Sequence, residues 1–338
     1  MKFHYEFDIK KLPQPVTHRH KLFLIGSCFT ENIGEKLKRS GFTIMENPNG
    51  ILFNPVSVAE AITGYIENSK VTEEELFYLN EGWHSWKHHS RYSGIIANDV
   101  VDKINQSTEN AHQFLKETEY VMITLGSAWV YFLSEKAANG KTGTVAANNH
   151  KAPSDWFNRR LLMLEEVLKV LDNVIHRLFL FNPGIKIIFT ISPVRHLREG
   201  VIENNRSKAL LIQAVHHLVD KFEGLFYFPA YELVIDDLRD YRFYAEDLMH
   251  PNYFATQYVW EKFVDACMNE KTRSLVKEIQ SIQLACQHKP FNAASEQHQK
   301  FLKSFYEKTK ALLEQHPYLE LHKELAFFKS GLNNTVTK

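Results

Sequence analysis

Short apolar runs followed by helical patterns recur along the first two thirds of the chain. Nearly continuous apolar runs of this length are typical of strands that are buried on both faces of a parallel sheet. The runs are 21–26 (KLFLIG), 120–126 (YVMITLG), 185–191 (IKIIFTI) and 225–229 (LFYFP). Helical patterns cover 28 to about 39, about 155–180, and 204–222. This alternation predicts a three-layer α/β/α fold with a doubly wound parallel sheet.

Two segments differ from this alternating pattern. Residues 136–153 are rich in Ala, Asn, Gly and Lys, and their Asn-Gly pair at 139–140 favours a hairpin within a long loop. Residues 269–338 are charged and helical, without a strand signal. We therefore expect one domain over 1–268, with a loop insertion at about 136–153, and a helical C-terminal extension over 269–338.

Composition excludes several classes of function. The 338 residues include 40 Lys and Arg and 40 Asp and Glu, so the composition does not predict a broad basic surface that would bind nucleic acid. No apolar stretch reaches the roughly 18 residues of a membrane span, and the N-terminus lacks a signal-peptide pattern. The three cysteines are too scattered for a disulfide framework or a zinc ribbon. These features favour a cytoplasmic protein without a metal site, and the absence of phosphate-binding glycine motifs argues against a nucleotide cofactor.

Ser27 follows the first predicted strand directly and stands at the start of a helix. Ligands of open parallel sheets bind beyond the carboxyl ends of the strands, and a helix N-terminus stabilises negative charge. This position suits a serine nucleophile. The structural alternative is an ordinary helix cap, in which the hydroxyl accepts a backbone N–H of the first turn. Cys28 beside it is expected to pack into the core.

Asp247 and His250 lie far downstream, three residues apart and just before a helical pattern. A carboxylate at this spacing can orient an imidazole, which then acts as a general base toward a hydroxyl from elsewhere. An Asp-x-x-His pair is common by chance. The pair is informative here because of its place in the chain. A serine follows the first strand, and the Asp-x-x-His pair stands before the last helix of the same domain.

Five sequence blocks together resemble the GSCFA family, a branch of the SGNH (GDSL-like) hydrolase superfamily. They span about 22 to 260, and the tail beyond about 270 lies outside the resemblance. The blocks are 26–29 (GSCF, followed by Thr30 where the family has Ala), 47–55 (NPNGILFNP), 123–131 (ITLGSAWVY), 192–196 (SPVRH) and 238–244 (LRDYRFY). The resemblance implies a flavodoxin-like arrangement of the sheet and serine-dependent acyl transfer without a cofactor.

The resemblance also implies roles for individual residues. Ser27 matches the nucleophile, and Asp247 and His250 match the Asp-x-x-His that completes a Ser–His–Asp triad. Backbone N–H groups of Ser27, Gly50 and Gly126 are the implied oxyanion donors, each worth roughly 3–4 kcal/mol.

One departure from the superfamily concerns its oxyanion asparagine. Ala128 stands in that position, and alanine has no side-chain donor. Ser127 and the 148–151 loop (NNHK) are candidate replacements. Our hypothesis is that Asn148 or His150 reaches the site.

Further candidate residues surround these motifs. The segment 83–91 (WHSWKHHSR) has three possible roles. It could line the substrate pocket through His88, or bind a metal if His84 and His88 shared a helix face. The third role is purely structural, with side chains that only pack. Arg195 is the better binding candidate of the Arg195-His196 pair, since a guanidinium binds carboxylate or phosphate. Trp129 could stack on a sugar ring.

The sequence therefore predicts a serine esterase or acyltransferase acting on O-acyl esters of small molecules or carbohydrates. Ser27 would be the nucleophile, His250 the base and Asp247 the residue that orients it. The main alternative is a binding or scaffold protein on the same fold whose site has degenerated, as Ala128 suggests. A metal hydrolase built on the 84–89 histidines is a third possibility.

Overall fold

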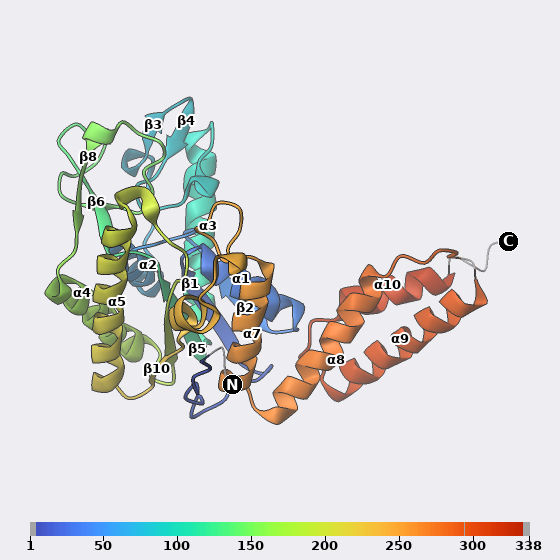
Figure 1. Ribbon diagram of the computed structural model, residues 1–338. Helices are drawn as coiled ribbons and strands as arrows, with labels where there is room; N and C mark the ends of the chain where they lie inside the picture. The colour runs from blue at the N-terminus through green and yellow to red at the C-terminus, as the bar shows by residue number, and fades with distance from the viewer. Residues whose placement is uncertain (1–4, 294, 334–338) are drawn as a thin grey trace.

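A parallel sheet forms the centre of the molecule in the computed structural model, which describes residues 5–293 and 295–333 (Figure 1). Within the described residues this sheet has five strands in the order β10-β9-β5-β1-β2. They are β1 (Lys21–Gly26), β2 (Thr43–Glu46), β5 (Tyr120–Leu125), β9 (Lys186–Ile191) and β10 (Leu225–Tyr227). If these five strands are renumbered 1 to 5 in chain order, their order across the sheet is 2-1-3-4-5, which is the flavodoxin-like arrangement. The predicted doubly wound fold is confirmed.

Helices cover both faces of this sheet. One face packs against α1 (Cys28–Arg39) and α7 (Tyr253–Cys267). The other packs against α2 (Pro55–Glu67), α3 (Ala97–Lys116), α4 (Leu164–Phe181) and α5 (Val201–Lys221). The short α6 (Ala230–Glu232) follows β10.

The first β-α unit shows why the sequence forms these elements. Every residue of β1 after Lys21 is buried, as expected for a central strand with helices on both faces. Helix α1 buries Phe29, Ile33 and Leu37, whose four-residue spacing puts them on one side of the helix. Both elements begin and end where the sequence pattern predicts.

The region between β5 and α4 corrects one prediction. A helix was expected over about 155–180, but Phe157–Leu161 forms strand β8 and α4 begins only at Leu164. β8 pairs antiparallel with β6 (Trp129–Leu133), which also pairs with β7 (Val145–Ala146). The Arg160 guanidinium lies over the Phe132 ring at 4.6 Å, so its long side chain covers the small sheet. The loop predicted at about 136–153 therefore contains a strand, and Asn139 and Gly140 lie in the connection between β6 and β7.

The remaining small sheet is a hairpin of β3 (Phe77–Leu79) and β4 (Gly82–His84). Strand β4 includes Trp83 and His84, so the helix that would put His84 and His88 on one face does not form. The Phe77 and Trp86 rings stack at 3.7 Å and fix the hairpin to the segment that follows it.

Helices α8 (Glu270–Gln287), α9 (Glu296–Gln315) and α10 (His322–Asn333) form the C-terminal part and project from the side of the sheet that carries α1 and α7 (Figure 1). They share a core of their own, which includes Ile279, Leu302 and Phe328. A Cβ added to Gly41, just after α1, would come within 2.9 Å of Ile279 Cδ1, so the two parts are closely packed there. The domain boundary near 268 stays a prediction.

Among the described residues, no helix is both long enough and apolar enough to cross a membrane.

Candidate active site

Ser27 lies at the carboxyl end of β1, where the order of strands reverses between β1 and β5. Gly26 before it has φ +141°, and a Cβ there would come within 2.1 Å of the Thr124 carbonyl oxygen. Only glycine fits this close approach of the two strands. Ser27 has no exposed surface, and its Oγ accepts the backbone N–H of Phe29 at 3.3 Å as the N-cap of α1. Cys28 packs beside the α1 and α7 core, and burial raises the pKa of its thiol.

Asp247 and His250 form a closely coupled pair in the loop before α7. Asp247 Oδ2 and His250 Nδ1 are 2.6 Å apart. The other carboxylate oxygen, Oδ1, accepts the backbone N–H groups of Met249 at 2.9 Å and His250 at 3.0 Å. These two N–H groups and the imidazole lower the pKa of Asp247 to about 2. The carboxylate is therefore ionised at neutral pH and holds Nδ1 of His250, which is the arrangement that a general-base histidine requires.

The same loop is fixed to the end of β9. The backbone N–H of Arg195 donates to the Met249 carbonyl at 3.1 Å, and the Arg195 guanidinium lies 4.2 Å from the centre of the Tyr244 ring. Among the described residues, no hydrogen bond joins Ser27 Oγ to His250 Nε2. The Asp–His pair is thus observed, whereas the complete triad stays a prediction, since catalytic hydrogen bonds often tighten only when substrate binds.

The three backbone N–H groups implied as oxyanion donors already donate to backbone carbonyls. These hydrogen bonds run from Ser27 to Thr124 (3.1 Å), from Gly50 to Asn47 (2.7 Å) and from Gly126 to Phe53 (2.8 Å). Gly50 has φ +79° in a tight turn, where an added Cβ would lie 2.2 Å from His89 Cβ. To bind an oxyanion, each N–H group would have to share or release its present acceptor. The oxyanion role of all three stays a prediction.

Helix α5 presents three polar side chains to this edge of the sheet, and the sequence analysis missed them. Asn204 Oδ1 accepts the N–H of His196 (3.0 Å), Ser207 Oγ accepts the N–H of Ala128 (2.7 Å), and Lys208 Nζ donates to the carbonyls of Gly126 and Ser192 (both 2.6 Å). All three are buried, and burial lowers the pKa of Lys208 from 10.5 to about 7. The helix thereby fixes the loops after β5 and β9. Their burial could have been predicted, because they precede Leu211 and Leu218 on the same buried side of the helix, but their hydrogen-bond partners could not.

His196, whose backbone N–H is bound by Asn204, lies in the loop after β9. Its ring lies edge-on to the Phe53 ring, with centroids 5.1 Å apart. A Cβ on Gly126 would come within 3.2 Å of His196 Nε2.

Three of the predicted substrate-binding residues, Asn148, His150 and His88, have their contacts elsewhere. His150 and His88 both bond to Ser85, through His150 Nε2 to the carbonyl and His88 Nδ1 to the hydroxyl, each at 2.9 Å. Asn148 Oδ1 accepts the N–H of His150 in a turn. The hypothesis that Asn148 or His150 reaches Ser27 has no contact to support it. Arg195, by contrast, lies beside the His250 loop.

Trp129 lies on β6, close to the first turns of α5. Its Nε1 donates to the Glu203 carbonyl at 3.4 Å, and the Arg159 guanidinium lies 5.6 Å from the ring centre. Its ring is thus already covered on one side.

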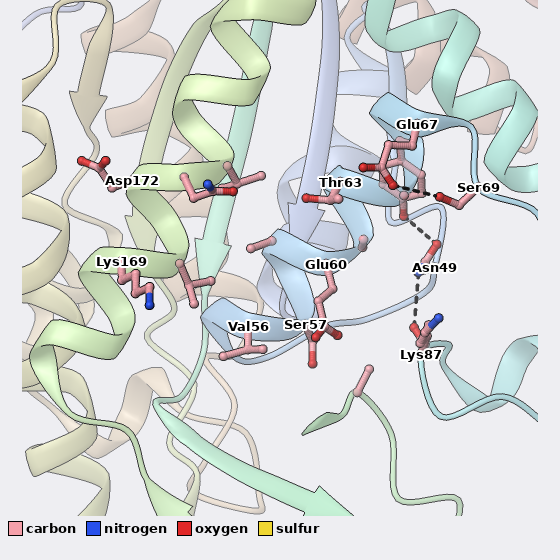
Figure 2. Close-up of a pocket in the computed structure, with 18 of the residues that line it drawn as sticks. Asn49, Val56, Ser57, Glu60, Thr63, Glu67, Ser69, Lys87, Lys169 and Asp172 are labelled. Atoms are coloured by element: carbon pink, nitrogen blue, oxygen red, sulfur yellow. Dashed lines mark hydrogen bonds between the residues drawn. The ribbon is translucent and has the colours of Figure 1, made fainter. Parts of the chain in front are cut away.

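A large cavity is separate from this edge of the sheet. It has a volume of about 1050 Å³ and lies along α2 and α4 (Figure 2). Figure 2 shows Glu60 and Thr63 on α2, with Lys169 and Asp172 on α4. His88 is the one predicted site residue in its lining, and Ser27 and His250 are not part of it.

The histidines that suggested a metal site have other partners. His84 Nδ1 lies 2.6 Å from Ser93 Oγ, and its Nε2 lies 2.9 Å from the Leu79 carbonyl oxygen. In the part of the chain that the structure describes, no three His, Cys, Asp or Glu side chains are grouped to hold a metal ion.

Solved structures with a related arrangement were found, but at low similarity. A Streptococcus pneumonia protein, provisionally named a platelet activating factor, is 14% identical with a TM-score of 0.39, covering 75% of this chain and 83% of that one. A family 3 carbohydrate esterase from Talaromyces cellulolyticus is 9% identical (TM-score 0.36, 77% and 99% covered), as is one from Clostridium thermocellum (TM-score 0.35, 77% and 98%). At this level the similarity carries no argument about function. No curated protein matched the chain.

Family models match both parts of the chain. The model described as the GSCFA family matches residues 21–263, and the model of the GSCFA C-terminal domain matches 279–334. The second match corrects the expectation that the tail beyond about 270 lies outside the resemblance. The five blocks, the flavodoxin-like sheet and these two matches lead to one conclusion: the chain belongs to the GSCFA family.

Proposed function

We propose that this protein is a serine esterase or acyltransferase that acts on O-acyl esters. The observation that carries the proposal is the Asp247–His250 pair. Its carboxylate is fixed by two backbone N–H groups, and its half-exposed imidazole is fixed at Nδ1. A purely structural role does not require a histidine that is held so firmly on one nitrogen and left open on the other.

In the proposed reaction, Ser27 Oγ attacks the acyl carbonyl carbon while its proton passes to His250 Nε2. The carbonyl π electrons move to oxygen and form the oxyanion. When the C=O bond re-forms, the bond to the leaving alkoxide breaks, and His250 returns the proton to it. Water or a second alcohol then attacks the acyl-enzyme in the same way and regenerates Ser27. Asp247 stabilises the imidazolium at each step.

The substrate class follows from this chemistry only broadly. We propose small or carbohydrate O-acyl esters, with Arg195 beside the site available to bind a negatively charged group. Because Ser27 is fully buried, the loops at the end of β1 and before α7 must move for an ester to reach it.

A second candidate function has specific support. Ser27 is buried and acts as a helix cap, and the three implied oxyanion N–H groups are occupied. A catalytically inactive binding protein on the same fold would also show these features.

Turnover of p-nitrophenyl acetate and of acetylated sugars would separate the two functions. An esterase should lose turnover in Ser27→Ala and in His250→Ala, and intact mass should show an added acyl group in the wild type only. Turnover that is equal in the wild type and Ser27→Ala, or absent from both, would favour the binding protein.

A further inference from the structure

The missing asparagine donor leaves the proposed oxyanion short of hydrogen bonds. Ala128 has no side-chain donor, and the three implied backbone donors already have carbonyl partners. We propose that His196 takes the place of the asparagine, with its Nε2–H donating to the oxyanion that forms when Ser27 attacks an ester. This proposal rests on the proposed function and adds a catalytic residue to it.

The register of the sheet puts Gly126, which His196 Nε2 lies against, next to the end of β1 that carries Ser27. Gly26 of β1 is paired with Thr124 of β5, so Ser27 and Gly126 directly follow two neighbouring strands, which lie about 4.8 Å apart in a sheet. His196 Nε2 lies against Gly126, where an added Cβ would approach it to 3.2 Å. The nitrogen is thus one strand away from Ser27, on the side of the sheet edge where ligands of this fold bind.

His196 Nε2 is buried and lacks a hydrogen-bond partner among the described residues. A buried polar atom without a partner is unfavourable and rare in native proteins. Its surroundings hold the ring in place, since Asn204 fixes the His196 backbone and Phe53 packs against the ring. An oxygen atom of the reacting ester would supply the missing partner.

The electrostatic surroundings keep this imidazole neutral. Burial, followed by the proximity of Lys208 and His250, lowers the pKa of His196 to about 3. At neutral pH the ring therefore carries a single N–H, and the proposal places it on Nε2. Because the ring resists protonation, His196 does not compete with His250 for the Ser27 proton. A preorganised neutral donor of this kind stabilises charge that appears only in the transition state.

The test compares His196→Phe with His196→Gln in the turnover of p-nitrophenyl acetate. Phenylalanine keeps a ring against Phe53 but removes the donor, whereas the glutamine amide can place an N–H near the position of Nε2. We expect His196→Phe to lower kcat by about 10²- to 10³-fold, with KM changed by no more than about threefold, and His196→Gln to recover at least about tenfold of that loss. His216→Phe, an exposed histidine of α5, is the matched control and should keep wild-type turnover.

The outcomes separate the two proposals. If the wild type shows Ser27-dependent turnover and His196→Phe retains kcat within about threefold, His196 is not a donor and the esterase proposal stands. Equal loss in His196→Phe and His196→Gln would show that the ring is only structural, which also overturns the donor role. If the wild type shows no Ser27-dependent turnover, both proposals fail. Unfolding in urea, followed for each variant, establishes that the folded state is retained.

Discussion

Replacing Lys208 by methionine should change how stability depends on pH. Lys208 is buried beneath the candidate site and donates to two backbone carbonyls, and burial lowers its pKa from 10.5 to about 7. In the unfolded chain the amine regains its ordinary pKa of 10.5. Between these two values, the unfolded chain binds more protons than the folded one, so the free energy of unfolding must rise with pH.

The size of this rise follows from the two pKa values. With about 7 in the folded and 10.5 in the unfolded chain, the free energy of unfolding increases by about 2 kcal/mol between pH 7 and pH 9. The sign is opposite to that of a lysine in an ion pair, because here folding disfavours the charged form. Lys208→Met has no titrating group at this position, so its free energy of unfolding should lack this rise between pH 7 and pH 9.

Urea unfolding at pH 7, 8 and 9 measures this difference. Tryptophan fluorescence is a suitable signal, because all five tryptophans precede residue 268 and therefore report on the part that contains the sheet. Lys221→Met is the control, since Lys221 is half-exposed at the end of the same helix and should leave the pH dependence unchanged. The reasoning predicts that the free energies of unfolding of wild type and Lys208→Met differ by an amount that changes with pH. If that difference stays constant within about 0.5 kcal/mol from pH 7 to 9, Lys208 does not have a lowered pKa in the folded protein.

Three further substitutions test the site. Asp247→Asn should lower kcat by about 10⁴-fold, because an amide N–H facing His250 Nδ1 favours the wrong tautomer, and kcat near wild type would rule out the orienting role. Gly126→Ala should reduce kcat in ester turnover without unfolding the protein, because the new Cβ would press on both His196 Nε2 and the Phe53 ring at 3.2 Å; turnover equal to wild type would contradict a role of this close packing. Asn47→Ala should cost about 1–3 kcal/mol in urea unfolding, since it removes the side-chain acceptor of a buried backbone N–H, and an unchanged midpoint would contradict this.

The central β-α alternation was predictable because its signal is strong and local. β1 and α1 appear with the predicted bounds, since an apolar run and a four-residue spacing admit few alternatives. The short edge strand β2 and strand β8 were not found. β8 contains Arg159 and Arg160, whose charges are atypical of a strand, and its pairing with the distant β6 is not visible in the local sequence.

The candidate site was predictable in part. The three-residue spacing of Asp247 and His250 permits a local hydrogen bond, and the structure forms it. The roles of Lys208 and His196 depend on the distant carbonyls and rings that the fold brings to them, and no local pattern encodes those contacts. Asn148 and His150 were predicted by analogy with a family motif, yet His150 contacts the β3–β4 hairpin and the loop after it, and Asn148 accepts the backbone N–H of His150.

Labelling with a fluorophosphonate probe tests the central claim most directly, because such probes react with serines activated by a neighbouring base. The account predicts that the wild-type protein is labelled at Ser27, that Cys28→Ala is labelled equally, and that Ser27→Ala and His250→Ala are not. Absence of labelling in the wild-type protein, or labelling that persists in Ser27→Ala, would contradict an activated serine at the end of β1.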